Sequence, residues 1–428
     1  MISNGLGNSI LLTSLLVVLG AYAFVSRREG SYLNILTPAL VVNVPASFLL
    51  PLAYNNLFGA EASVYAFAFV YATLALESVL FAYFYTRPRI NPIRLPFHYG
   101  YDNLGKLAIL ALGFSALLFA PLLIEFREDI LDPRRIYEQT RTGFGVTYYI
   151  SSTCAYLTII LILFTKQSFV RKTLIIFVSG VVLSLHGSKG QVVSVFFLLI
   201  LFETYVNRRK LKLLHASLVG VGFALLLVGL FAATMALGSP LEAVESLSQY
   251  SDYTRNAMLV IDSSLPQQFG RLTLESNVLG LVPRALVPNK PKDFGALYLD
   301  EKFYPEAMDA DKGAPAFGVG LQYADFGFLS IIYLGLFAAF KGWLASGFVC
   351  RLKQTRHPAD FLVVAFLADV TVFPIGIGWL LPETLLVAMF LRYVSCFGSG
   401  KIYHERIRHR GPTLPPPGSE PVGGLEGI

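Results

Sequence analysis

A proline-rich stretch dense in cations, residues 282–292, has the residue types and spacing to bind an anion. It reads Val-Pro-Arg-Ala-Leu-Val-Pro-Asn-Lys-Pro-Lys. Pro283 and Pro288 flank Arg284, and because proline fixes φ, we expect a stiff, extended segment that presents its cations with little loss of entropy. Arginine binds phosphate through two parallel hydrogen bonds, and lysine binds it as a point charge. The pattern therefore predicts that Arg284 and Lys290 bind a phosphate-like group.

Arg271, in the sequence Phe-Gly-Arg upstream of this stretch, adds a further candidate cation. A different interpretation is that these cations neutralise carboxylates of the same segment. Asp293, Asp300 and Glu301 lie close enough in sequence to do so. Both interpretations stay open at this point, although the cluster as a whole favours anion binding.

A second candidate group is the turn His186-Gly-Ser-Lys-Gly190, which joins two apolar runs. Lys189 is either a lysine whose ammonium reaches the membrane interface or a cation that holds an anion in an outward-facing cavity. His186 is the only one of the six histidines that the topology derived below places on the outer side. We therefore keep two interpretations of His186, one structural and one catalytic.

Asp369 lies in the middle of an apolar run, ahead of Pro374. A carboxylate within a membrane span is expensive and needs a partner. We expect Asp369 to pair with an arginine or lysine of the helix bundle.

The composition indicates that these residues are carried by a membrane protein. The chain has 54% hydrophobic and only 14% charged residues, whereas a soluble domain has about 25% charged residues. The net charge of +6 comes from basic residues in short loops between apolar runs, which is typical of membrane orientation and excludes nucleic acid as a partner. The sequence contains no phosphate-binding P-loop and no dinucleotide fingerprint, so chemistry driven by ATP is not expected. The three cysteines and the histidines show no spacing for a disulfide framework or a zinc site.

The sequence predicts an all-α polytopic membrane protein with about eleven transmembrane helices, because a helix needs roughly 20 apolar residues to cross a bilayer. The first run lacks a positive segment ahead of it and is followed by Arg27 and Arg28, so we expect a retained span rather than a signal peptide. The expected spans are residues 9–26, 33–55, 62–85, 107–124, 146–165, 172–186, 191–206, 216–237, 328–349, 360–380 and 382–398.

Basic residues set the expected orientation of these spans. Every odd-numbered connection is rich in Lys and Arg, whereas the even ones are tiny, acidic or mixed, and cytoplasmic loops carry the basic excess. We therefore expect a periplasmic N-terminus, a cytoplasmic C-terminus and a large periplasmic loop, residues 238–328, within a transmembrane domain of residues 1–400. Residues 401–428, rich in Pro and Gly, are expected to form a disordered cytoplasmic tail.

Four motifs scattered over most of the chain resemble those of the bacterial O-antigen polymerases of the Wzy type, which polymerise oligosaccharide repeat units. The Pro-Arg…Pro-Asn-Lys-Pro element is the most specific of them, and the Lys189 motif differs from the commoner Gly-Ser-Arg-Gly form of the family. The motifs are Arg141-Thr-Gly-Phe-Gly, Gly-Ser-Lys-Gly at 187–190, Val-Pro-Arg-Ala-Leu-Val-Pro-Asn-Lys-Pro at 282–291 and Gln-Tyr-Ala-Asp-Phe-Gly at 322–327.

This resemblance implies a membrane-embedded glycosyltransferase of the GT-C type in the bacterial inner membrane. Such an enzyme transfers a growing glycan from undecaprenyl pyrophosphate to the next lipid-linked repeat unit, on the periplasmic side. Its implied partners are undecaprenyl-pyrophosphate-linked oligosaccharides and the lipid bilayer, and a chain-length regulator is an open candidate. It needs no cofactor and no metal, because cations can stabilise the pyrophosphate as it leaves.

With this chemistry, the candidate site residues take two roles. The candidates for binding the pyrophosphate are Arg284, Lys290, Arg271, Lys189 and Arg141. The acceptor hydroxyl also needs a proton acceptor, for which His186, Asp325 and Glu275 are unranked candidates.

Two other functions remain possible from the sequence. An O-antigen ligase uses the same donor, so residues that bind the donor cannot separate it from a polymerase. A transporter or flippase for the lipid-linked unit belongs to another class and is expected to show an internal repeat. We find no such repeat, and one dominant external loop suits an enzyme better.

Overall fold

The structure is a computed structural model whose regular elements, in the residues that it describes, are all helical. The described residues are 3–59, 61–87, 103–129, 136, 144–187, 189–210, 222, 252–279, 287, 289–291, 293–306, 316–370, 387–389 and 391. The predicted all-α class is therefore confirmed for this part of the chain. The predicted tail, residues 401–428, lies outside it.

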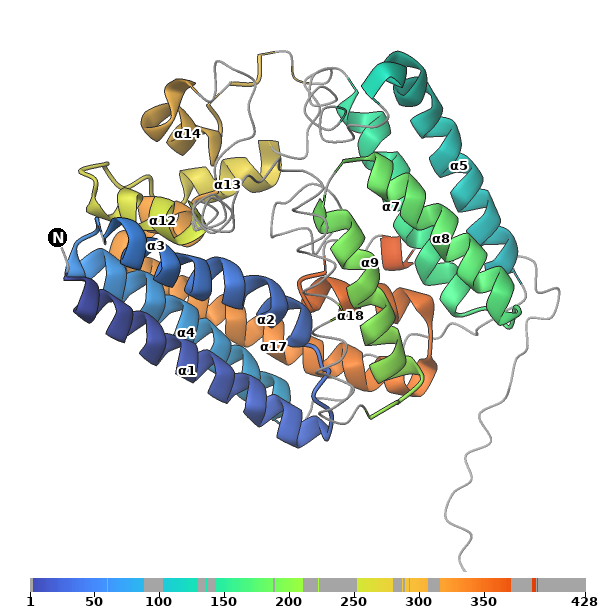
Figure 1. The fold of residues 1–428 in the computed structure, drawn as a ribbon, viewed down its shortest axis with the longest axis horizontal. Coiled ribbons are helices and arrows are strands. Elements are labelled where there is room, and N and C mark those ends of the chain that lie inside the picture. The colour runs from blue at the N-terminus through green and yellow to red at the C-terminus, as the bar shows by residue number, and fades with distance from the viewer. Residues whose placement is uncertain are drawn as a thin grey trace, which may run out of the picture.

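Long helices from both ends of the sequence form the first group, which Figure 1 shows as a bundle in blue and orange. They are α1 (Asn4–Glu29), α4 (Val64–Thr86) and α17 (Ser330–Thr355), with α2 (Thr37–Val44), the π-helical turn η1 (Pro45–Leu49) and α3 (Leu50–Phe58) in a row beside them. A Cβ added at Gly342 of α17 would lie 2.4 Å from the carbonyl oxygen of Phe81 in α4. Glycine at this position therefore lets the two helix backbones touch.

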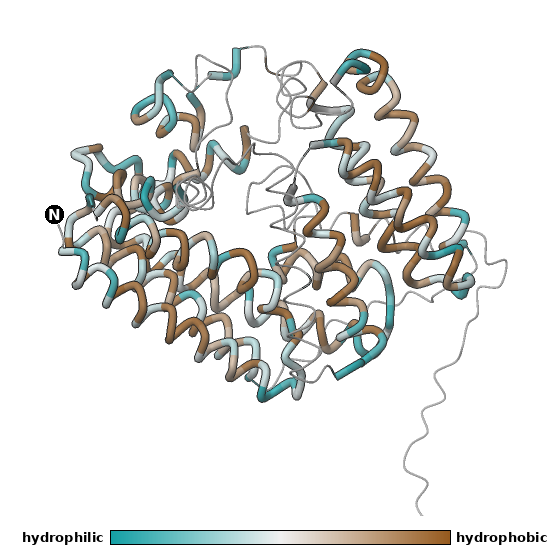
Figure 2. Tube along the Cα trace, viewed as in Figure 1, coloured by the Kyte–Doolittle hydropathy of each residue, from teal (hydrophilic) through white to brown (hydrophobic). Residues whose placement is uncertain are grey.

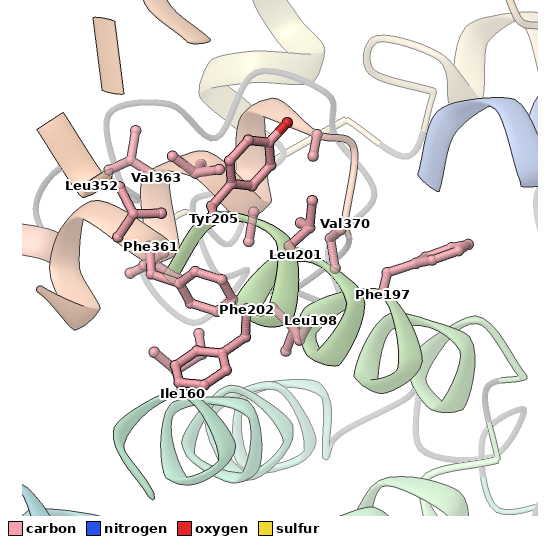
Figure 3. Close-up of a cluster of buried hydrophobic side chains, with 14 of the residues drawn as sticks. Ile160, Phe197, Leu198, Leu201, Phe202, Tyr205, Leu352, Phe361, Val363 and Val370 are labelled. Carbon is pink, nitrogen blue, oxygen red and sulfur yellow. The ribbon is translucent and has the colours of Figure 1, made fainter. Parts of the chain in front are cut away.

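Helices from the middle of the sequence form the second group. They are α5 (Leu104–Glu125), which continues into the 3-10 turn η2 (Arg127–Asp129), α7 (Gly145–Leu163), α8 (Phe169–Leu185) and α9 (Lys189–Leu201), which continues into the π-helical turn η3 (Phe202–Val206). α18 (Pro358–Leu367) joins them to α17. Figure 3 shows the junction, where the rings of Phe202 and Phe361 meet edge to face with their centroids 5.9 Å apart and Ile160 packs below them.

Two ion pairs, one of them buried, hold α17 to the segments that follow it. Arg351 of α17 contacts Asp360 of α18 at 3.1 Å, and both side chains are buried. Lys341 of α17 forms an ion pair with Asp369, just beyond α18. This second pair confirms the expectation that Asp369 has a basic partner in the bundle.

Short helices of the long loop cap one end of the first group. They are α12 (Asp252–Asp262), α13 (Arg271–Val278), α14 (Leu297–Phe303) and α16 (Gly320–Phe326), followed by the turn η6 (Gly327–Leu329). α12 packs on α4 and α16, and α13 packs on α16. Asp262 at the end of α12 accepts a hydrogen bond of 2.7 Å from the backbone N–H of Ser63, just before α4. We refer to these four helices as the external helices.

Within the described residues, five segments are long and apolar enough to cross a membrane. They are Asn4–Glu29, Thr37–Phe58, Val64–Thr86, Leu104–Glu125 and Gly320–Thr355. Hydrophobic residues run along them in Figure 2, with polar residues mostly at their ends. Of the eleven expected spans, 216–237 and 382–398 lie almost wholly outside the described residues. The count of eleven and the orientation therefore stay predictions.

Candidate functional site

Asp325, one of the three predicted proton acceptors, holds the first turn of α13. Its side chain is fully buried. One carboxylate oxygen accepts a hydrogen bond from the backbone N–H of Leu272 at 3.0 Å, and the other accepts from the N–H and the hydroxyl of Thr273 at 2.7 and 2.6 Å. The first N–H groups of a helix lack partners within the helix, and a carboxylate there is also favoured by the helix dipole. Asp325 thus fixes the position of α13 on α16.

Arg271 is the first residue of α13 and interacts with Glu275 one turn later. Its Nε lies 3.5 Å from Oε1 of Glu275, and its guanidinium carbon lies 5.0 Å from the ring centroid of Tyr298 in α14. About half of the Arg271 side chain remains exposed. Arg271 is therefore oriented by an acid and an aromatic ring while it stays accessible to a ligand.

The segment that carries Lys290 is docked on α13 through Gly295 and Ala296. The backbone N–H of Gly295 donates to Oε2 of Glu275 at 2.9 Å, and the N–H of Ala296 donates to the hydroxyl of Ser276 at 3.1 Å. Gly295 has a φ of +59°, and a Cβ there would lie 2.8 Å from the backbone nitrogen of Ser276. Only glycine fits this approach without strain.

Lys290 is buried against an aromatic ring near this docking point. Its side chain is 9% exposed, and its ammonium nitrogen lies 4.0 Å from the ring centroid of Phe294, in the range of a cation–π contact. Of the eight predicted site residues, Arg271, Glu275 and Asp325 thus lie on or against α13, and Lys290 lies in the segment that is docked on the same helix.

His186 ends α8, in the second helix group. Its ring stacks on Phe119 with a centroid distance of 4.1 Å and meets Tyr148 edge to face at 4.7 Å. Nδ1 lies 2.7 Å from the carbonyl oxygen of Val182, which indicates that Nδ1 carries the proton. Nε2 is buried and, among the described residues, no atom lies within hydrogen-bonding geometry of it.

The side chains of three predicted phosphate-binding residues lie outside the part of the chain that the structure describes. Arg284 and Arg141 lie outside the described residues. The backbone of Lys189 begins α9, three positions after His186, and its side chain also lies outside the description.

Asp300 of α14 is a further candidate functional residue. From the sequence, it is only one of the carboxylates that could neutralise the cations of the loop. It is fully buried, and neither of its carboxylate oxygens has a hydrogen-bond partner among the residues that the structure describes. Burial raises the pKa of Asp300 to about 7. No feature of the sequence distinguishes Asp300 from its exposed neighbour Glu301, because burial follows from how α14 packs on the other external helices.

The described residues contain no group of three or more His, Cys, Asp or Glu side chains that could hold a metal ion. The described part of the site contains the partly exposed guanidinium of Arg271, the buried ammonium of Lys290 and, in the second helix group, the imidazole of His186. Cations of this kind stabilise a phosphate leaving group, and a neutral imidazole can accept a proton from a hydroxyl.

Comparison with known proteins gives the chain a family. It is 34% identical over 414 residues to the O-antigen polymerase of Salmonella typhimurium strain LT2, covering 94% of this chain and 97% of that protein. The O-antigen polymerase of Salmonella typhi matches with the same identity and coverage. No family model and no solved structure matches the chain. The similarity runs through nearly the whole length of both proteins, and the chain therefore belongs to the O-antigen polymerase family.

Proposed function

We propose that this chain polymerises O-antigen repeat units by glycosyl transfer between lipid-linked oligosaccharides. The observation that carries the proposal is the 34% identity to O-antigen polymerases over 94% of the chain. The apolar helices and the external assembly with its cations support it. The donor would be a glycan on undecaprenyl pyrophosphate, and the acceptor would be the next lipid-linked repeat unit.

The reaction breaks a bond between a sugar and pyrophosphate and forms a glycosidic bond between two sugars. The bond between the anomeric carbon of the donor glycan and the pyrophosphate oxygen breaks, and its electron pair leaves with the pyrophosphate. The acceptor hydroxyl oxygen forms the new bond to the same carbon and gives its proton to a base. Negative charge builds on the leaving pyrophosphate, so cations aimed at it lower the barrier.

Arg271 and Lys290 fit the role of phosphate ligands in this reaction. Arg271 is held by Glu275 and Tyr298 yet stays about half exposed, and Lys290 lies in the segment docked on the same helix. We assign Arg284, Lys189 and Arg141 to the same pyrophosphate on the sequence pattern alone. Undecaprenyl pyrophosphate would thus be bound by charge, without a metal.

His186 is the proton acceptor that the geometry favours. Both oxygens of Asp325 and both oxygens of Glu275 already accept hydrogen bonds or an ion pair within the external helices. Within the described residues, Nε2 of His186 has no hydrogen-bond partner, while Nδ1–H is held by a backbone carbonyl. This arrangement fixes the tautomer that leaves Nε2 able to accept a proton.

The proposed topology has eleven spans of the GT-C type in the inner membrane, with a periplasmic N-terminus and a cytoplasmic C-terminus. Support comes from the alternation of Lys and Arg between connections and from the external helices, which cap one end of α4. Reporter fusions test it: a fusion at Asp300 should show periplasmic activity only. A reporter active in the cytoplasm at Asp300 would reverse the topology.

The proposed function is tested by deleting the gene for this chain and examining the surface glycan. A polymerase deletion leaves lipid A core capped by single repeat units, and the wild-type chain should restore a ladder of lengths. A ligase deletion would instead leave lipid-linked polymer that never reaches the outer membrane, and loss of a flippase would leave no exported repeat. A chain-length regulator is a proposed partner, whose removal should change the distribution of lengths and leave polymerisation itself intact.

A further inference from the structure

The helix α13 exposes two of its three apolar side chains, Leu274 and Val278, while the third, Leu272, is buried. Leu274 and Val278 are 65% and 52% exposed, whereas Thr273 and Ser276 are buried. Positions three and four apart share a face of a helix, so Leu274 and Val278 lie on the same face as Arg271. In a helix that borders water, the apolar face points to the protein interior. The exposure of two large apolar side chains on one face indicates that this face of α13 meets an apolar environment.

The turn before α13 adds an aromatic ring to this face. Phe269 is 85% exposed, and its backbone has a φ of +52°, a conformation that is rare for a bulky side chain. Two main-chain hydrogen bonds enforce the turn, because the N–H groups of Gln268 and Phe269 each donate at 2.9 Å, to the carbonyl oxygens of Ala324 and Asp325. The fold thus holds Phe269 outward at the expense of backbone strain.

A stripe of apolar residues runs along the membrane-spanning helix α17. The stripe has the three- and four-residue spacing of one helix face, and its members are exposed in the isolated chain. They are Leu329, just before the helix, and Ile332, Leu336, Phe340 and Trp343 within it. The turn that carries Phe269 lies against the segment just before this helix, since the ring of Phe326 lies near Gly270 and the side chain of Gln267 lies near Gly327. The ring of Phe326 in turn packs on Tyr333 of α17, with the centroids 5.1 Å apart.

We infer that Phe269, Leu274 and Val278 lie in the interfacial region of the bilayer, at the end of α17 where the external helices sit. Two observations favour the bilayer as the occupant. The turn that carries Phe269 lies beside the start of α17, a helix long and apolar enough to span the membrane, and the half-exposed Arg271 on the same face as Leu274 complements the negative phosphates of lipid headgroups. Large aromatic and aliphatic residues beside a cation are typical of helices that lie in this interface.

The position of this face in the membrane also bears on the proposed reaction. A face immersed in the interface sets Arg271 at the depth of the lipid phosphates, where the pyrophosphate of a lipid-linked donor also lies. Because the placement concerns only this face and the bilayer, it can be tested without any glycan substrate.

Quenching of single tryptophans in lipid vesicles tests the placement. The background is the full chain with Trp343→Phe and Trp379→Phe, which removes both native tryptophans. Phe269→Trp and Leu274→Trp then report on the face, and Glu301→Trp on the exposed surface of α14 is the matched control. Each variant is reconstituted into phosphatidylcholine vesicles, with or without bromine on the upper part of the acyl chains. Iodide in the buffer probes access from water.

We expect brominated lipid to remove most of the emission of Phe269→Trp and Leu274→Trp, and iodide to have little effect. Glu301→Trp should show the reverse. Iodide quenching at positions 269 and 274, with indifference to brominated lipid, would overturn the inference. A third arm adds a few mole per cent of undecaprenyl phosphate without bromine. If this relieves the quenching by brominated lipid, the face is a groove for the carrier chain, which also overturns the placement in the bilayer.

Discussion

One carboxylate oxygen of Asp325 contacts Thr273 twice, at 2.7 Å from the backbone nitrogen and 2.6 Å from the hydroxyl oxygen. Asp325 lies on α16 and Thr273 on α13, more than fifty positions earlier in sequence. This contact connects a residue that looks catalytic in the sequence to the first turn of the helix that presents Arg271. It indicates that Asp325 acts by positioning Arg271.

Asp325→Ala is therefore expected to destabilise the protein as well as to reduce polymer synthesis. The change leaves buried N–H groups of Leu272 and Thr273 without acceptors, and each such group costs about 1–3 kcal/mol. Thermal unfolding of the purified protein in detergent measures the loss. An unchanged melting temperature together with lost activity would instead make Asp325 the proton acceptor.

His186→Gln is expected to reduce polymerisation by roughly 10²–10⁴-fold, the usual contribution of a general base. Glutamine keeps much of the volume between Phe119 and Tyr148 but cannot accept the proton. The measurement is the rate of chain extension at equal membrane levels of protein. Tyr148→Phe, which removes the hydrogen bond to the carbonyl of His186 and keeps the ring that packs on the imidazole, is the matched control and should stay active. Near-normal extension by His186→Gln would exclude this histidine as the base.

Arg284→Ala is expected to reduce polymerisation by roughly 10²–10³-fold, the effect of losing one donor to developing charge. Arg284→Lys should recover only part of the rate, since a point charge replaces a two-pronged donor. Arg271→Ala should show a similar defect without loss of protein, because Arg271 is about half exposed. Length ladders of surface glycan, with protein levels from blots, provide the comparison. Full-length polymer from both alanine variants would place the pyrophosphate site elsewhere in the chain.

The raised pKa of Asp300 predicts that the stability of the fold falls as the pH rises. Its pKa is raised from 3.8 in its ordinary state to about 7 in the fold, so the folded protein holds this proton more tightly than the unfolded chain does. The stabilisation is complete below about pH 4 and is lost as pH rises through 7, because an unpaired buried charge then forms. Asp300→Asn should flatten this dependence and raise the melting temperature at pH 8 relative to wild type. An identical pH profile for the two proteins would show that Asp300 is solvated or paired.

The sequence predicts most of the helices because their apolar runs are long and their ends are marked. Ser63 and Ser168 cap α4 and α8, as their side chains accept hydrogen bonds from the first turns. The carboxylate of Asp369, in an apolar run of the sequence, signals its need for a cation, and Lys341 supplies it. The expected place in the middle of a helix is wrong, because α18 ends at Leu367 and Asp369 lies in the turn beyond it. These features depend on local sequence, where hydropathy and capping act directly.

The site is harder to predict because its geometry depends on contacts between distant segments. Asp325 and Glu275 look like free acids in the sequence, yet Asp325 bonds to the start of α13 and Glu275 bonds to Gly295. The burial of Asp300 and the outward position of Phe269 also arise only when the external helices pack together. Neither hydropathy nor motif spacing shows which carboxylates will accept structural hydrogen bonds in the fold.

Reconstituted polymerisation tests the central claim most directly. The purified chain, in vesicles that contain undecaprenyl-pyrophosphate-linked repeat units and no ATP, should produce a ladder of lengthening lipid-linked glycans and release undecaprenyl pyrophosphate. Heat-denatured protein is the control and should leave the single repeat unit unchanged. If active, correctly inserted protein joins single repeats only to added lipid A core, or forms no glycosidic bond at all, the account of this chain as the polymerase is contradicted.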